Sequence, residues 1–236
     1  MKPVLRTPRP AGILAQLVMI LALVNLFSAG GTMTSRAAGA SGPVRIVAFG
    51  DSLTAGYMLT PAEAFPAQLE KALEGKGHDV EIANAGVSGD TSAGGRQRLD
   101  WSVPEGTEAV ILELGSNDAL RGIDPSLVKE SLDDIVKRLK ARGVEILIAG
   151  MSAPENWGKD YADRFNAIYG DLAERYDLIL YPFFLDGVAL TPELNLPDGL
   201  HPTGKGISII VERILPDAET LVGRVLARRN GAVTSR

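Results

Sequence analysis

The chain has 236 residues, of which 45% are hydrophobic and 22% are charged, and its formal net charge is −5. This length suits one domain with a full core, and the composition is that of a globular protein rather than a disordered one. No basic block follows the N-terminal segment, so we expect no nucleic-acid partner. The absence of cysteine excludes a cysteine nucleophile and a thiolate metal site.

Residues 1–40 have the pattern of a secretory signal peptide. The basic residues come first, at Lys2, Arg6 and Arg9. An apolar run at 12–27 follows, and residues 38–40 form an Ala-x-Ala cleavage site. The alternative is an N-terminal membrane anchor, but the run is short for a span of roughly 20 residues. We favour cleavage and therefore expect an exported protein, periplasmic or secreted, with a membrane-anchored form as the alternative.

The remaining domain, residues 41–236, is more acidic than the whole chain. Four basic residues and no acidic residue lie in 1–40, so their removal changes the net charge from −5 to −9. Anionic lipid surfaces repel such a protein weakly. We therefore expect no obligatory membrane contact after cleavage, and we expect a monomer whose stability depends on its core rather than on disulfides.

Strand-like and helix-like segments alternate along residues 41–236. Apolar strand-like runs occur at 44–49, 79–84, 108–114, 144–150 and 177–181. Amphipathic helix-like stretches occur at 62–75, 126–142, 160–175 and 205–228. This alternation predicts an α/β fold with a parallel sheet and helices on both faces.

Small and polar residues follow several of these strands. Ser52, within Gly50-Asp51-Ser52-Leu53, comes directly after the first strand, and the other loops of this kind span 86–91, 115–118 and 198–202. Because the loops after parallel strands emerge at one edge of a sheet, residues far apart in sequence can converge there.

A serine nucleophile needs a base within hydrogen-bond reach. The chain has two histidines, and His78 lies in a turn at the opposite edge of the sheet, where a solvent-exposed residue is expected. His201 lies at the edge of Ser52, and Asp198 precedes it by three residues. That spacing lets the carboxylate hold one imidazole nitrogen while the other faces the serine. We predict Ser52, His201 and Asp198 as the catalytic residues.

Acyl transfer also requires donors for the oxygen that becomes negative. The candidates are the backbone N–H groups of Ser52 and Gly89 and the side-chain amide of Asn117. Simpler interpretations stay open: Gly89 as a turn glycine, and Asn117 in an Asx turn with Asp118 capping a helix.

Four blocks together resemble the SGNH/GDSL hydrolases, and they span 50–57, 88–92, 113–122 and 198–202. The resemblance covers about residues 44–220 and is greatest to the bacterial exported thioesterase/lysophospholipase/arylesterase branch. It implies a three-layer α/β/α, flavodoxin-like fold with a central parallel sheet of about five strands. It assigns the nucleophile to Ser52, the base to His201, its orienting acid to Asp198 and the oxyanion donors to Gly89 and Asn117.

Two segments depart from that pattern. The third block has Ser116 where the family often has glycine. Residues 151–158 resemble a substrate-lining loop, with Ser152 where that branch commonly has arginine. The resemblance implies substrate contacts from Pro154 and Asn156 in this loop.

Other functions are weaker hypotheses. Residues 199–205 have P-loop spacing, but Gly206 replaces the required Ser or Thr. Two distant histidines and no cysteine disfavour a metal site, so we expect neither metal nor cofactor. Asp51, Asp90 and Asp118 could form an acidic cluster, although hydrogen bonding within loops and caps is the better interpretation.

We therefore predict a serine esterase that hydrolyses small acyl esters through an acyl-enzyme. Its expected substrates are aryl esters and short or medium acyl esters, extending to acyl thioesters and lysophospholipids. Two alternatives stay open: a carbohydrate-ester deacetylase of the same fold, and a non-catalytic exported binding protein.

Overall fold

Five parallel strands form one sheet in the order β2-β1-β3-β4-β5 in the computed structural model, which describes residues 42–234. The strands are β1 (Val44–Gly50), β2 (Val80–Gly86), β3 (Ala109–Glu113), β4 (Glu145–Ala149) and β5 (Ile179–Tyr181). The last residue of β1, Gly50, pairs with Gly86 of β2 on one side and with Glu113 of β3 on the other. The loops that follow these three strands therefore start side by side.

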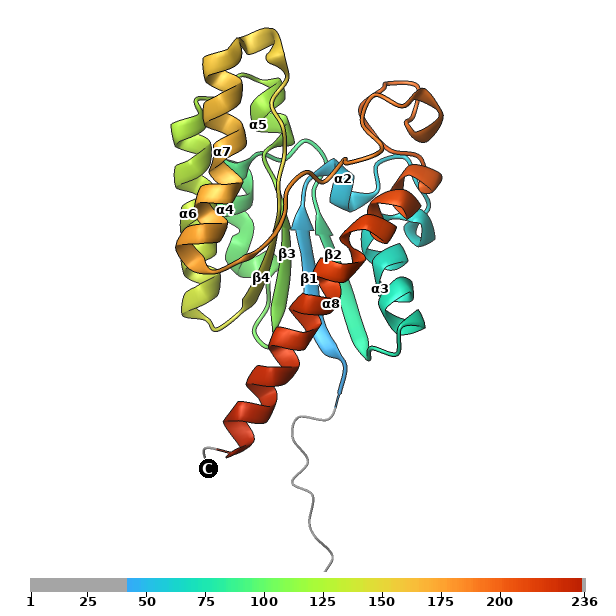
Figure 1. The fold of residues 1–236 in the computed structure, drawn as a ribbon, viewed down its shortest axis with the longest axis vertical. Coiled ribbons are helices and arrows are strands. Elements are labelled where there is room, and N and C mark those ends of the chain that lie inside the picture. Colours follow the sequence, from blue (N-terminus) through green and yellow to red (C-terminus); the bar gives the residue numbers. More distant parts are fainter. Residues whose placement is uncertain (1–41, 235–236) are drawn as a thin grey trace, which may run out of the picture. The chain divides into compact units, whose positions relative to one another are not determined.

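Helices cover both faces of the sheet (Figure 1). The helices α3 (Phe65–Gly75) and α8 (Gly204–Thr234) pack on one face. On the other face lie α4 (Ser92–Ser102), α6 (Pro125–Ala141) and α7 (Lys159–Tyr176). Short helices occupy the loops: α2 (Ser52–Ala55), α5 (Ser116–Leu120), and the 3₁₀ turns η1 (Pro61–Glu63), η2 (Glu155–Trp157) and η3 (Pro192–Leu194). The predicted three-layer α/β/α fold with a five-stranded sheet is confirmed.

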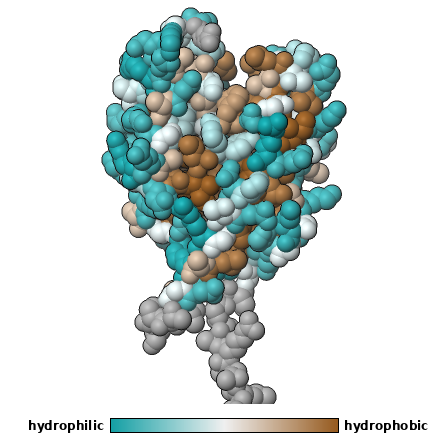
Figure 2. All heavy atoms as spheres, viewed as in Figure 1, coloured by the Kyte–Doolittle hydropathy of each residue, from teal (hydrophilic) through white to brown (hydrophobic). Residues whose placement is uncertain are grey.

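The strands are buried because helices shield both faces of the sheet. Every residue of β3 is buried, and in β1 only Arg45 is exposed. On α6 the buried positions recur at helical spacing, as at Leu132, Ile135 and Leu139, while the outer surface on the side of α6 and α7 is mostly hydrophilic (Figure 2). Burying each such side chain contributes about 1.5–3 kcal/mol, so this core fixes the frame that carries the loops.

The strand predictions are confirmed with small shifts at their ends, but two helical features differ. The predicted helix 62–75 is interrupted at Ala64, which separates η1 from α3. Helix α4 was not predicted because its buried face carries Gly95 and Arg98 beside Leu99 instead of a hydrophobic stripe. A Cβ on Gly95 would lie 2.3 Å from the Leu114 side chain, so the small residue lets α4 pack closely on the sheet.

The predicted signal peptide or anchor at residues 1–40 lies outside the described residues. The described residues belong to one compact unit, Gly39–Arg236. From residue 42 to residue 234, no helix combines the length and the apolar character needed to cross a membrane.

Substituting alanine at two glycines, Gly86 and Gly170, should change the free energy of unfolding in opposite directions. A Cβ on Gly86 would lie 2.2 Å from the backbone nitrogen of Ala55, whereas a Cβ on Gly170, inside α7, has no heavy atom within 4 Å. We expect Gly86→Ala to lower the free energy of unfolding by about 1–3 kcal/mol through overpacking. Gly170→Ala should raise it by about 0.5–1 kcal/mol because glycine is entropically unfavourable in a helix. Urea unfolding midpoints measure both, and a stabilising Gly86→Ala would contradict the close approach.

Candidate active site

Ser52 lies at the sharp turn between β1 and α2. Gly50 ends the strand, and a Cβ there would lie 2.1 Å from Thr54 Oγ1, so a side chain does not fit. Asp51 caps α2 by accepting the backbone N–H of Leu53 at 3.0 Å. The turn places Ser52 at the carboxyl edge of the sheet, as the sequence predicts.

The loop before α8 brings His201 and Asp198 to Ser52. Asp198 Oδ1 accepts the backbone N–H groups of Leu200 and His201 at 2.9 and 3.0 Å. Its Oδ2 lies 2.7 Å from His201 Nδ1, and His201 Nε2 lies 2.9 Å from Ser52 Oγ. The ring of Tyr57 packs on the imidazole with 4.4 Å between centroids. The three predicted catalytic residues therefore form one hydrogen-bonded chain, and Tyr57, which was not predicted, supports its middle member.

The same contacts determine the charge of Asp198. The backbone N–H groups of His201 and Leu200, and then the imidazole, lower the pKa of Asp198 from 3.8 to about 2. Asp198 is therefore negative throughout the neutral range. A negative carboxylate at Nδ1 favours the tautomer that keeps its proton on Nδ1 and leaves Nε2 free to accept the serine proton.

Asn117, in α5, lies among the residues that line the cavity beside Ser52. Its Nδ2 atom donates to the backbone oxygen of Asp90 at 2.9 Å and to Asp51 Oδ2 at 3.1 Å. Both amide hydrogens therefore have an acceptor in this state. Gly89 precedes Asp90 and has a φ of +82°, a conformation that favours glycine, but it is not among the residues that line the cavity.

Two buried carboxyl groups lie beneath this edge. Glu113 Oε2 accepts the backbone N–H of Asp51 at 3.3 Å and the hydroxyl of Thr54 at 2.7 Å, while Oε1 is buried with no hydrogen-bond partner among the described residues. Burial raises the pKa of Glu113 well above its usual value, and the nearby charge of Asp51 raises it further. Burial also raises the pKa of Asp51, but Leu53, Ser116 and Asn117 all donate to it. Glu113 is therefore the member of the pair whose pKa is raised more strongly.

Glu113 was not predicted as part of the site. The signal was a glutamate at the end of a fully buried strand, which is a rare position for a charged side chain. The aspartates behave as the loop and cap interpretation predicts. Asp118 accepts the backbone N–H and the hydroxyl of Ser92, and Asp90 pairs with Arg98. Within residues 42–234, no three potential metal ligands gather closely enough to hold an ion.

A cavity of about 440 Å³ opens beside Ser52 and His201. Its polar lining consists of these two residues with Ser116, Asn117 and Ser152. The other lining residues are apolar: Leu53, Ala119, Leu120, Met151, Ala153, Pro154, Phe183, Leu185, Ala189, Leu190 and Leu200. The cavity is thus mostly apolar, and its polar lining includes a row of three residues, Ser52, Asn117 and His201.

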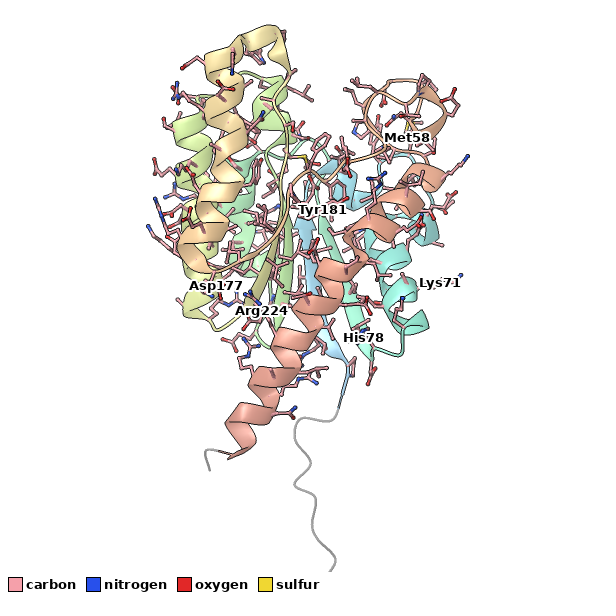
Figure 3. All side chains as sticks on the ribbon, in the orientation of Figure 1. Met58, Lys71, His78, Asp177, Tyr181 and Arg224 are labelled. Carbon is pink, nitrogen blue, oxygen red and sulfur yellow. The ribbon has the colours of Figure 1, made fainter. Side chains whose placement is uncertain are left out.

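Only some of the remaining predicted residues line this cavity. Of the two predicted substrate contacts, Pro154 lines the cavity, whereas Asn156 is exposed in η2 and is not a lining residue. The wall formed by residues 183–190 was not predicted, although its position after β5 at the same edge was a usable signal. His78 lies near the start of β2, away from the site, and is half-buried against Glu219 of α8 at 3.2 Å rather than freely exposed (Figure 3).

Comparison with known proteins agrees with this geometry. The model of the GDSL-like lipase/acylhydrolase family matches residues 48–208. An arylesterase of Vibrio mimicus is 38% identical over 67% of this chain and 80% of its own length. The thioesterase 1/protease 1/lysophospholipase L1 of Escherichia coli is 36% identical over 80% of this chain and 89% of its own. The crystal structure of AlinE4, an SGNH-hydrolase family esterase, is 44% identical, has a TM-score of 0.64 and covers 75% of this chain and 96% of that one.

A serine turn at the carboxyl edge of a parallel sheet, facing a histidine held by an aspartate, defines the class of α/β serine hydrolases. The chain belongs to the GDSL-like lipase/acylhydrolase family. It is a serine hydrolase that acts on ester bonds.

The ionisation of Asp198 can be measured directly. We expect its carboxyl ¹³C shift to stay constant from neutral pH down to about pH 3, below the usual aspartate pKa of about 3.9. In His201→Ala the pKa should remain lowered, because its largest causes are backbone N–H groups. Because the folded-state pKa is the lower one, Asp198 stabilises the fold above about pH 4, and this contribution is lost as the pH falls through about 2.

Asp217 provides an internal control. Burial raises its pKa, so we expect it to titrate above the usual aspartate value, whereas Asp198 titrates below it. A midpoint for Asp198 at its ordinary value in the unmodified protein would contradict the geometry of the loop.

Proposed function

We propose that this protein hydrolyses small carboxylic esters through an acyl-enzyme formed on Ser52. The observation that carries the proposal is the continuous chain from Asp198 through His201 to Ser52, which opens on an apolar cavity. Such a chain supplies a nucleophile, a base and an orienting acid, and the cavity supplies space for an acyl or aryl group.

The reaction proceeds in two steps. His201 Nε2 takes the proton of Ser52 Oγ as this oxygen bonds to the acyl carbon, and the histidine then gives the proton to the leaving oxygen as its bond to carbon breaks. Water enters, loses a proton to the same nitrogen and attacks the acyl-enzyme. The carboxylic acid leaves, and Ser52 regains its proton. Asp198 holds the imidazole and stabilises its cationic form.

The oxyanion is stabilised by the backbone N–H groups of Ser52 and Gly89 and by the amide of Asn117. Since both amide hydrogens of Asn117 have acceptors, one bond must be exchanged, and we propose that the bond to Asp51 is given up because that oxygen has a second donor. The hydroxyl of Ser116 remains on the same Asp51 oxygen at 2.9 Å and keeps the buried carboxylate partnered.

The lining of the cavity supports aryl esters and short or medium acyl esters as substrates. The names of the relatives support an extension to acyl thioesters and lysophospholipids. An acetylated carbohydrate would meet the apolar wall with its hydroxyl groups unpaired, which disfavours the deacetylase alternative. Pro154 forms part of this wall, and we propose that Asn156, which is exposed in the adjoining turn η2, contacts the leaving group outside the cavity. We further propose export through residues 1–40 and a monomeric exported form.

A substrate panel with Ser52→Ala tests the proposal. The panel contains p-nitrophenyl acetate and butyrate, an acyl-CoA, a lysophospholipid and acetylated xylan, all measured with one purified sample. We expect the two aryl esters to be turned over, and Ser52→Ala to lower their kcat by at least about 10⁴-fold because the nucleophile is lost. Ser126→Ala, at an exposed serine on α6, is the matched control and should keep full activity.

Undiminished turnover by Ser52→Ala would overturn the mechanism. Efficient deacetylation of xylan combined with no aryl-ester turnover would overturn the substrate class and favour the carbohydrate alternative.

Asn117→Ala tests the oxyanion donor. We expect kcat to fall by about 10²–10³-fold with little change in KM, because a donor used in the transition state is removed. Steady-state kinetics give both constants, and a thermal melt shows how much the loss of the bond to Asp51 weakens the fold. A loss of kcat below tenfold would remove Asn117 from the oxyanion site.

A further inference from the structure

We infer that Arg98 of α4 is a positioning residue that holds the oxyanion-binding loops together. The inference rests on the proposed function, because it concerns the groups assigned there to the oxyanion. Arg98 lies behind the site and does not line the cavity, so its action is through the backbone segments that it binds.

The guanidinium of Arg98 joins three segments at the carboxyl edge. Nη2 donates to the backbone oxygen of Gly50 at 2.8 Å, immediately before the serine turn. Nη1 donates to the backbone oxygen of Ala85 at 2.8 Å, near the end of β2. Nε donates to Asp90 Oδ2 at 2.6 Å, in the loop that carries Gly89. One planar group thus fixes the ends of β1 and β2 and the loop that follows β2.

The third segment leads to Asn117. The backbone oxygen of Asp90 accepts the amide of Asn117 at 2.9 Å, so the residue whose side chain binds Arg98 also orients the amide donor. The guanidinium therefore binds the backbone just before the serine turn and the side chain of Asp90. Asp90 follows Gly89 in the chain, and its backbone oxygen accepts from Asn117. A displacement of about 1 Å in such donors can cost about 10²-fold in rate.

The ion pair between Arg98 and Asp90 is buried rather than on the surface. The side chain of Arg98 is 7% exposed and that of Asp90 is 12% exposed. The guanidinium carbon also lies 4.1 Å from the centroid of the Phe49 ring, which adds a cation–π contact. A buried pair of this kind is weak evidence for a stabilising role, since apolar substitutes are often as stable. Nη1 also donates to Ser102 Oγ of the same helix at 3.1 Å, and the fork geometry, which lysine lacks, is what these four acceptors require.

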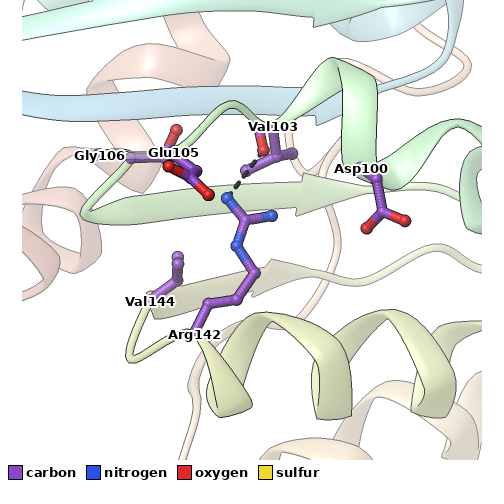
Figure 4. Close-up of a pocket in the computed structure, with 7 residues that line it drawn as sticks. Asp100, Val103, Glu105, Gly106, Arg142 and Val144 are labelled. Atoms are coloured by element: carbon purple, nitrogen blue, oxygen red, sulfur yellow. Dashed lines mark hydrogen bonds between the residues drawn. The ribbon is translucent and has the colours of Figure 1, made fainter.

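Arg142 provides a control at the opposite edge of the sheet. Its Nη2 donates to the backbone oxygens of Val103 and Pro104 at 2.8 and 2.9 Å, beside a shallow pocket that includes Asp100 and Glu105 (Figure 4). Arg142 thus also ties loop carbonyls together, but in the turn that precedes β3 rather than after the strands. Arg142 is exposed, so its removal controls for the loss of an arginine that binds loop carbonyls, without touching the oxyanion loops.

The test compares Arg98→Lys, the double variant Arg98→Met with Asp90→Asn, and Arg142→Met. Arg98→Lys keeps a cation beside Asp90, and the double variant leaves no unpaired buried charge, so we expect both to fold, which the thermal melt checks. For each, p-nitrophenyl butyrate gives kcat and KM, a thermal melt gives stability, and an alkyl trifluoromethyl ketone gives Ki. The ketone forms a tetrahedral adduct with Ser52 that places an oxyanion at the donors.

We expect both Arg98 variants to lose about 10- to 10²-fold in kcat, with KM within about threefold of the unmodified value. The Ki of the ketone should rise by the same factor as the loss in kcat/KM, because both report transition-state stabilisation. Arg142→Met should leave kcat and Ki unchanged.

A Ki that stays constant while kcat falls would overturn the inference, because the donors would then bind the oxyanion of the adduct as well as they do in the unmodified protein. Unchanged kcat and Ki in the double variant would overturn it as well. Failure of the proposed function is distinguishable, because it would appear as turnover that does not depend on Ser52.

Discussion

The close packing at the end of β1 is the constraint on which the site depends. Gly50 is paired on both sides, with Gly86 and Glu113, and a Cβ there would meet Thr54 and the backbone of β3. The chain must leave the sheet at this point and turn at once into α2, with Asp51 as its cap. Ser52 is therefore held at the sheet edge by backbone packing, and its geometry does not rely on its own side-chain contacts.

Around this turn, hydrogen bonds between buried polar groups fix the positions of the loops, which non-directional apolar contacts alone cannot do. Asp51 accepts three donors, Glu113 accepts two, and Arg98 binds two carbonyls and Asp90. In a low dielectric such bonds are strong and directional, and an unpaired group is costly. The network therefore allows few arrangements of the loops, which suits a site whose donors must be placed before charge develops.

The cavity separates two tasks. In the mechanism we propose, its polar row, at Ser52, Asn117 and His201, carries out bond making and breaking. The wall at 183–190 and 151–154 is mostly apolar, and we propose that it accepts a carbon chain or ring. A wall of this kind discriminates weakly between similar acyl groups, because a methylene contributes only about 1–3 kcal/mol. The same catalytic groups can therefore serve several esters, in keeping with the range of names among the relatives.

The sequence by itself determined the features that depend on local pattern. These are the alternation of strands and helices, the serine after β1 and the three-residue spacing that lets Asp198 hold His201. Only the tertiary structure decided the features that depend on contacts far apart in the chain. Helix α4 buries Gly95 and Arg98 where a periodic pattern needs hydrophobic residues, and Glu113 meets Asp51 across 62 positions. The amide of Asn117 has two acceptors from two other loops. Such pairings have no local signature, because they arise only when the sheet register brings the strand ends into one row.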